Sequence, residues 1–127
     1  MTSPATGAIL LVEDDEATRG IFEAALSDVG YVVHAAGTGA GALTRLRNES
    51  FDLVVLDLML PGITGPEVLD AMQKGPATAQ IPVIVVTGAT LNQRELGSLN
   101  VVTMLRKPVD PYVLVDAVYL ALHGRRE

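Results

Sequence analysis

The 127-residue chain contains no cysteine and no tryptophan, and only 4% of its residues are aromatic. The absence of cysteine excludes disulfide bonds, thiolate zinc sites and a cysteine nucleophile. Basic residues are also scarce, since 9 lysines and arginines face 15 acidic residues and give a formal charge of −6. Nucleic-acid binding depends on basic side chains that neutralise phosphates, so this balance argues against a direct nucleic-acid partner.

Long hydrophobic runs are missing as well, because no stretch approaches the roughly 18 uninterrupted apolar residues of a membrane-spanning helix. Residues 1–7 lack the basic and apolar regions of a secretory signal. We therefore expect a flexible lead-in over residues 1–7 and a cytoplasmic protein without a membrane partner. Hydrophobic residues make up 49% of the chain, and the length suits one domain, which we place at residues 8–124 with a short tail over 125–127.

Five short apolar runs, each bounded by turn residues, have the composition of strands that are buried on both faces. They are Ala8–Val12, Tyr31–Ala35, Leu53–Leu56, Pro82–Val86 and Val101–Leu105. Segments with helical spacing of apolar residues lie between them. This alternation predicts an α/β fold: a single doubly wound, five-stranded parallel sheet with helices on both faces.

The predicted helices carry recognisable start and stop signals. The apolar stripe within 21–26 is followed by Gly30 as a C-terminal cap, and Asp110 with Pro111 begins the last helix as N-cap and first residue. The segment 65–67, Gly-Pro-Glu, opens the third helix in a similar way. A fourth helix over 92–99 is short and contains a glycine, so we expect it to be the least stable element.

Polar side chains follow the predicted strands at their carboxyl ends, the edge where open α/β sheets bind ligands. These are the acidic run Glu13–Glu16, then Asp57, Thr87 and Lys107. Carboxylates crowded at one edge repel each other and need a cation. Carboxylate oxygens with open positions for water and a phosphoryl oxygen are typical of Mg²⁺ sites. A cation and an ammonium beside one carboxylate would suit phosphoryl transfer to that carboxylate.

Four segments together resemble the receiver domain of two-component response regulators. They are the run Ile-Leu-Leu-Val-Glu-Asp-Asp over 9–15, the block Val-Val-Leu-Asp-Leu-Met-Leu-Pro-Gly-Ile-Thr-Gly over 54–65, the strand Pro-Val-Ile-Val-Val-Thr-Gly over 82–88, and the pair Lys107-Pro108. They occur in order, with 42 residues from Asp15 to Asp57, 30 more to Thr87 and 20 more to Lys107. The resemblance implies the flavodoxin-like strand order 2-1-3-4-5, for which a chemotaxis receiver is a standard example.

The resemblance also implies a role for each matching residue. Asp57 would accept a phosphoryl group from a phosphohistidine, Thr87 would hydrogen-bond a phosphoryl oxygen, and Lys107 would pair with Asp57 and then with the phosphoryl group. The implied Mg²⁺ ligands are Asp15 directly, Asp14 through water, Asp57, and the backbone carbonyl of Met59. Pro108 would follow a cis peptide bond.

The implied function is that of a signalling switch, which is not an enzyme but assists its own phosphorylation and dephosphorylation. The implied partners are a sensor histidine kinase or phosphotransfer protein and a downstream protein or output domain. A second copy of the chain is a further candidate, through the face of the fourth helix, fifth strand and fifth helix. We expect no DNA-binding segment after the last helix; a stand-alone regulator and a fragment of a longer protein both stay open.

Other interpretations of the same residues stay open. Asp14, Asp15 and Glu16 are residue types that stabilise the start of a helix. Receivers usually carry Tyr or Phe three residues before the lysine, where this chain has Met104. We interpret Met104 as a core residue. Because the aromatic residue is missing, a phosphorylation-independent pseudo-receiver, which would act as a binding module, stays open. The segment 37–42 fits the dinucleotide pattern G-x-G-x-x-A. A hydrolase of the haloacid dehalogenase type would need a second Asp where Met59 stands.

Overall fold

The computed structural model describes residues 6–88 and 100–124. Within them, one five-stranded parallel sheet has the order β2-β1-β3-β4-β5. The strands are β1 (Ala8–Val12), β2 (Val32–Ala36), β3 (Leu53–Leu56), β4 (Val83–Thr87) and β5 (Val101–Arg106). The predicted fold class and strand order are therefore confirmed.

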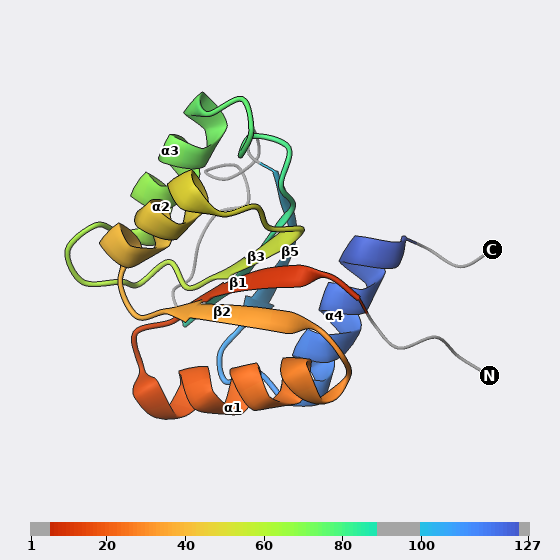
Figure 1. The fold of residues 1–127 in the computed structure, drawn as a ribbon. Coiled ribbons are helices and arrows are strands. Elements are labelled where there is room, and N and C mark those ends of the chain that lie inside the picture. The colour runs from red at the N-terminus through yellow and green to blue at the C-terminus, as the bar shows by residue number, and fades with distance from the viewer. Residues whose placement is uncertain (1–5, 89–99, 125–127) are drawn as a thin grey trace.

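The four described helices cover both faces of this sheet (Figure 1). The helices are α1 (Glu16–Asp28), α2 (Gly39–Asn48), α3 (Gly65–Lys74) and α4 (Pro111–His123). Helices α1 and α4 cover one face, and α2 and α3 cover the other. The helix that the sequence predicts over 92–99 lies outside the described residues, so α4 corresponds to the last predicted helix.

Side chains of the central strands alternate between two hydrophobic cores. In β1, Leu10 and Val12 join the core under α2 and α3, whereas Ile9 and Leu11 join the core under α1 and α4. All four side chains are fully buried. Helices on both faces of a parallel sheet bury both sets of side chains, and this explains why β1 reads as a continuous apolar run.

Each of the four described helices begins with a side-chain cap. Asp15 caps α1, Thr38 caps α2, Thr64 caps α3 and Asp110 caps α4. At α3 the cap is a reciprocal box, in which Thr64 N donates to Glu67 Oε1 at 3.0 Å and Glu67 N donates to Thr64 Oγ1 at 3.3 Å. These caps fix where each chain segment leaves the carboxyl edge of the sheet.

The predicted boundaries differ by one residue in three strands and at one helix end: β2 and β4 are shifted by one residue, and β5 ends one residue later, at Arg106. Strand β2 starts after Tyr31 because the Tyr31 N–H closes the α1 turn by donating to the Leu26 carbonyl. Val29 is the C-cap of α1, and the predicted cap Gly30 is the next residue, with a φ of +113° that glycine adopts without strain. Strand β4 extends through Thr87. No helix in the described ranges is both long and apolar enough to span a membrane.

Candidate functional site

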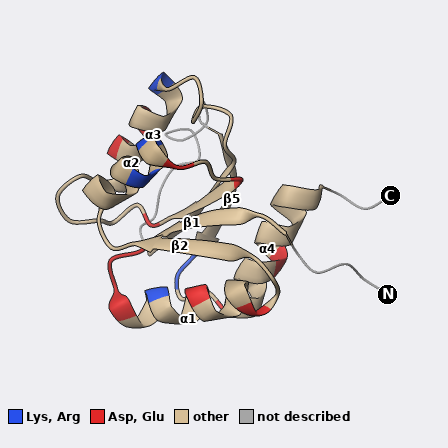
Figure 2. Cartoon of the chain, viewed as in Figure 1, with Lys and Arg blue, Asp and Glu red and all other residues tan. Residues whose placement is uncertain are grey.

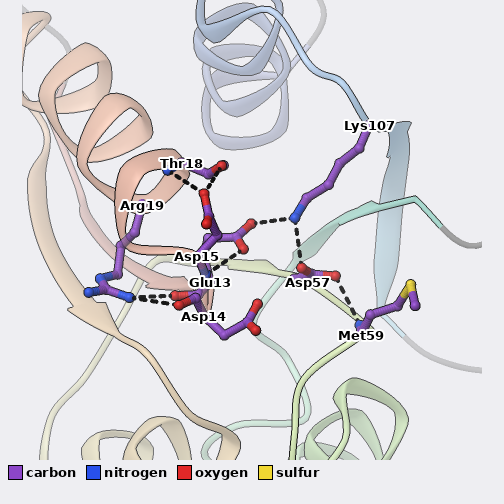
Figure 3. Close-up of polar contacts among 8 residues, drawn as sticks. All are labelled: Glu13, Asp14, Asp15, Thr18, Arg19, Asp57, Met59 and Lys107. Carbon is purple, nitrogen blue, oxygen red and sulfur yellow. Dashed lines mark hydrogen bonds and ion pairs between the residues drawn. The ribbon is translucent and has the colours of Figure 1, made fainter.

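Asp57 lies at the centre of the carboxyl edge, directly after β3 (Figure 3). Its backbone N–H donates to the Val12 carbonyl at 3.0 Å and continues the pairing of β3 with β1. The residue is 3% exposed, and both carboxylate oxygens accept a hydrogen bond. Met59 N donates to Oδ1 at 2.9 Å, and Lys107 Nζ donates to Oδ2 at 2.8 Å. The carboxylate is therefore held in one orientation.

Lys107 bridges two acidic residues from different strand ends. Its ammonium lies 2.8 Å from Glu13 Oε1 and 2.8 Å from Asp57 Oδ2. The residue follows β5, where its backbone N–H donates to the Thr87 carbonyl at 3.0 Å. The Lys107–Pro108 peptide bond is cis, as the resemblance predicted. The loop after β5 thus places the ammonium between the ends of β1 and β3.

Glu13 is the more deeply buried of these two acids, with 1% of its surface exposed. Burial raises the pKa of its carboxyl, and the hydrogen bond from Lys107 offsets part of this rise. Burial alone would lower the pKa of Lys107, but its bonds to Asp57 and Glu13 outweigh burial and raise the pKa above the ordinary value. The ammonium therefore stays charged at neutral pH.

Glu13, Asp14 and Asp57 form a group in which one carboxylate oxygen of each lies within 4.8 Å of the others. Glu13 and Asp57 are buried, whereas Asp14 is exposed at the rim. Hard oxygen donors with one open side match a cation that keeps several water ligands, as Mg²⁺ does. The residues present therefore fit a magnesium site.

Asp15, the predicted direct metal ligand, lies at the start of α1 and is not part of this acidic group. Asp15 Oδ2 accepts hydrogen bonds from Thr18 N at 2.9 Å and from Thr18 Oγ1 at 2.5 Å, so it caps α1. These two bonds lower the pKa of its carboxyl. Glu13, which the sequence analysis did not select, takes the place in the acidic group. The helix-start interpretation of this acidic run thus holds for Asp15.

Arg19 is a second residue at this edge that sequence reasoning missed. In the first turns of α1, its Nη1 donates to the Glu13 carbonyl at 2.9 Å and lies 3.4 Å from the Asp14 carbonyl (Figure 3). The sequence feature that could have pointed to Arg19 is its position four residues after Asp15, which places it in the first turns of the helix that begins at this edge. Figure 2 shows the acidic segment that leads from β1 into α1, with a basic residue in the same helix.

The remaining predicted site residues lie at the same edge in different settings. Thr87 is 2% exposed and is the last residue of β4. Met59 is 61% exposed, and its backbone N–H donates to the Asp57 carboxylate. Met104 is partly buried and packs against the core under α2 and α3, as the core interpretation expected.

The glycine-rich segment 37–42 has a packing role in this structure. Thr38 Oγ1 accepts the Gly41 N–H at 3.0 Å and starts α2. Gly39 is buried, and a Cβ atom there would overlap the Ile63 carbonyl oxygen. The glycine thus lets α2 approach the loop after Asp57, which explains this residue type without a dinucleotide.

Comparison with known proteins places the chain in a family. The family model of the response regulator receiver domain matches residues 9–119. The chain is 37% identical over 107 residues to the transcriptional regulatory protein AfsQ1 of Streptomyces coelicolor, a match over 84% of this chain and 44% of that protein. It is 34% identical over 120 residues to a probable cyclic di-GMP phosphodiesterase of Vibrio cholerae, over 93% of this chain and 27% of that protein.

Solved structures agree with these relatives. The chemotaxis protein CheY4 of Vibrio cholerae superposes with a TM-score of 0.86 at 27% identity, over 93% of this chain and all of that one. A CheY-like receiver from Methanospirillum hungatei gives the same TM-score at 29% identity, over 94% of this chain and 95% of that one. The chain belongs to the response regulator receiver family, a family of phosphoacceptor signalling domains.

This membership decides between the alternatives at the level of protein class. A receiver is a signalling domain, so neither a dinucleotide-dependent enzyme nor a dehalogenase-type hydrolase describes this chain. Receivers act with histidine kinases and output domains. The chain spans less than half of the length of the two curated relatives described above.

Proposed function

We propose that this receiver takes a phosphoryl group on Asp57 from a phosphohistidine of a histidine kinase or phosphotransfer protein, in a Mg²⁺-dependent reaction. The observation that carries the proposal is the position of Asp57. Its buried carboxylate is bonded to Lys107 and lies in one group with Glu13 and Asp14. This is the arrangement that phosphoryl transfer to a carboxylate requires.

In the transfer, an Asp57 oxygen forms a bond to phosphorus as the bond from phosphorus to the histidine nitrogen breaks. The Met59 N–H and the Lys107 ammonium orient the carboxylate before attack. Lys107 then has a fixed positive charge close to the phosphoryl oxygens, because its raised pKa keeps it protonated. Positioning and charge, rather than proton transfer, are what these residues contribute.

The cation would be held by Asp14 and Asp57, with Glu13 acting directly or through water and the Met59 carbonyl as a further ligand. When bound, Mg²⁺ neutralises negative charge that develops on the phosphoryl oxygens. Asp15 stays at the start of α1, where its carboxylate already accepts two hydrogen bonds from Thr18. This ligand set replaces the one that the resemblance suggested for the β1–α1 loop.

Phosphorylation would act as a switch because it adds an anion of roughly −2 charge with strong acceptor oxygens. Thr87 lies at the end of the strand next to β3, and Lys107 follows the strand beyond it. New bonds from both residues to the phosphoryl group would shift the loops after β4 and β5. The switch is driven by the difference in these bonds between the two loop states.

Exposed apolar side chains occur on β5 and α4, the described elements of the face through which the resemblance implies contact with a second copy. Val102 of β5 is 53% exposed, and Tyr119 and Leu120 of α4 are 42% and 57% exposed. We expect an output domain, a downstream protein or a second copy of the chain to contact this surface. A change in sedimentation coefficient on phosphorylation would identify the second copy.

Intact mass spectrometry after incubation with Mg²⁺ and a small acyl phosphate tests the proposed function. Wild-type protein should gain the mass of one phosphoryl group, and Asp57→Asn should gain none. Asp52→Asn is the matched control, because Asp52 is an exposed acid whose carboxylate accepts the Ala8 N–H, away from the acidic group.

Two results would contradict the proposal. Retention of the added mass in Asp57→Asn would place the phosphoryl group on another residue. An unmodified wild type would favour a phosphorylation-independent binding module, the function that Met104 in place of an aromatic residue leaves open.

A further inference from the structure

Arg19 contacts the acidic site from the side opposite to Lys107 (Figure 3). Lys107 binds the carboxylate of Glu13, whereas Arg19 Nη1 donates to the carbonyl of Glu13 at 2.9 Å and lies 3.4 Å from the carbonyl of Asp14. These carbonyls belong to two members of the proposed cation site. The two basic residues therefore hold the same short segment by its side chain and by its backbone.

Both backbone polar groups of Glu13, the N–H and the carbonyl, form hydrogen bonds. Its N–H donates to the Ala36 carbonyl at 3.1 Å, at the end of β2, and its carbonyl accepts from Arg19. A carbonyl in a strand-to-helix turn otherwise faces water and leaves the peptide plane free to rotate. Rotation of the plane after Glu13 would change the direction in which the Asp14 side chain leaves the backbone.

The surroundings of Arg19 leave room for this contact. The first residue after β2 is Gly37, and a Cβ atom there would come within 3.1 Å of Arg19 Nη1 and 3.7 Å of its Cζ. The guanidinium thus packs against a glycine backbone, and α1 presents the Arg19 stem from its first turns. Among the ion pairs found in the described residues, none involves Arg19, so its bonds at this site go to neutral carbonyls.

We propose that Arg19 is a positioning residue for the phosphoryl-transfer site: through the carbonyls of Glu13 and Asp14 it fixes the β1–α1 turn so that their carboxylates face Asp57. The inference deepens the proposed function and rests on it. Arg19 itself touches neither the cation nor the phosphoryl group. Groups that orient metal ligands in this way typically contribute about 10- to 100-fold to metal affinity.

Arginine suits this role better than lysine. The two N–H groups of one guanidinium nitrogen lie in a plane and diverge, so they reach two successive carbonyls without further loss of side-chain freedom. A lysine ammonium would end near the place of the Arg19 Cζ, one bond short of Nη1. Arg19→Lys therefore keeps the charge and loses the geometry, and Arg19→Met loses both.

The first test uses the protein without added metal. The Asp15 N–H donates to Glu13 Oε2 at 3.1 Å, so its hydrogen exchange reports the order of this turn. Exchange at Asp15 should be at least about tenfold faster in Arg19→Met than in wild type. Exchange in β3 should be unchanged. Equal exchange at Asp15 in the two proteins would overturn the proposal.

The second test is calorimetric titration with Mg²⁺ alone, without a phosphodonor. Arg19→Met should bind about 10- to 100-fold more weakly than wild type, and Arg19→Lys should recover less than half of this loss on a logarithmic scale. Arg47→Met is the matched control, because Arg47 is exposed on α2 and bonds Thr44 Oγ1 at 3.3 Å. This control should bind Mg²⁺ like wild type.

Further outcomes separate this inference from the function on which it rests. Full recovery of binding in Arg19→Lys would show that charge alone matters and would overturn positioning. A lower melting temperature with unchanged Mg²⁺ affinity would show a purely structural role and would also overturn it. Failure of the wild type to gain phosphate would reject the proposed function, while the exchange measurement would still decide the role of Arg19.

Discussion

Replacement of Asp14 by asparagine removes one of three gathered carboxylates and keeps the shape of the side chain. One carboxylate oxygen of each of Glu13, Asp14 and Asp57 lies within 4.8 Å of the others, and the Lys107 ammonium is bonded to Glu13 and Asp57. Without a divalent cation, this arrangement contains more negative than positive charge. We expect Asp14→Asn to make the metal-free protein more stable and to weaken its response to Mg²⁺.

The separations in the structure set the size of the effect. Two unit charges 4.8 Å apart repel by roughly 3.5 kcal/mol at an effective dielectric constant of about 20 and by roughly 0.9 kcal/mol at that of water. Asp14 is exposed and Lys107 offsets part of the repulsion, so we expect a gain of about 1–2 kcal/mol in the free energy of unfolding. For a chain of this length, that gain corresponds to a rise of about 4–8 °C in Tm.

Thermal unfolding in a chelating buffer, and then with added Mg²⁺, measures both parts of the effect. Wild type should gain stability with Mg²⁺, by about 2.7 kcal/mol at 100 times the Kd, and Asp14→Asn should gain much less. Asp15→Asn is the matched control, since asparagine caps a helix about as well as aspartate and Asp15 lies outside the acidic group.

Two results would refute this reasoning. An unchanged or lower Tm of Asp14→Asn in chelator would show that the three carboxylates do not repel each other in the folded state. Loss of the Mg²⁺ response in Asp15→Asn, with a normal response in Asp14→Asn, would place the cation at the predicted Asp15 and not at the observed group.

Four further changes probe other parts of the site and fold. Lys107→Met leaves two buried carboxylates without their ammonium and should cost about 3–5 kcal/mol in urea unfolding at pH 7; a stable variant would show that the bridge is dispensable. Gly65→Ala places a Cβ against the Leu58 backbone, 2.8 Å from the Asp57 carbonyl oxygen, and should cost about 1–3 kcal/mol in the same assay. Thr87→Ala should still gain phosphate by mass but should lose most of the phosphorylation-induced amide shifts in β4 and β5; retention of those shifts would remove Thr87 from the switch. Glu67 has a pKa below its ordinary 4.5 because of its bonds in the capping box, so its stabilising effect is present above pH 4.5 and is lost as pH falls through the folded pKa. Glu67→Gln should therefore reduce the loss of stability on acidification, measured by urea unfolding between about pH 6 and pH 3.

The sheet could be predicted from the sequence because its central strands are buried on both faces. In β1 and β3, each residue has to be apolar whichever way its side chain points, so the run itself marks the strand. The ends of some strands could be predicted only to within one residue. Tyr31 looks like a strand residue by type, but its N–H is already used to close the α1 turn.

The side chains of the acidic run after β1 could not be placed individually from the sequence. Four consecutive acids, Glu13–Glu16, follow β1, and the identity of a residue in a turn does not show which way its side chain points. That direction is set by local hydrogen bonds, here those from Thr18 to Asp15. The spacing of Asp15 and Thr18 is that of an N-cap and its N3 residue, a signal that would have separated the capping acid from the two acids of the group, Glu13 and Asp14.

The topology explains why an acidic group is tolerated at this edge of the sheet. Every strand is parallel, so each described helix begins at the carboxyl edge, where the unpaired N–H groups and the positive end of the helix dipole lie. The start of α1 at Asp15 adjoins the acidic group, and Gly65 at the start of α3 lies against the Asp57 carbonyl. At the opposite edge the same carboxylates would face helix C-termini, which carry partial negative charge. The direction of the strands thus favours this edge for an anionic phosphoacceptor, and Lys107 and Arg19 then fix the geometry within it.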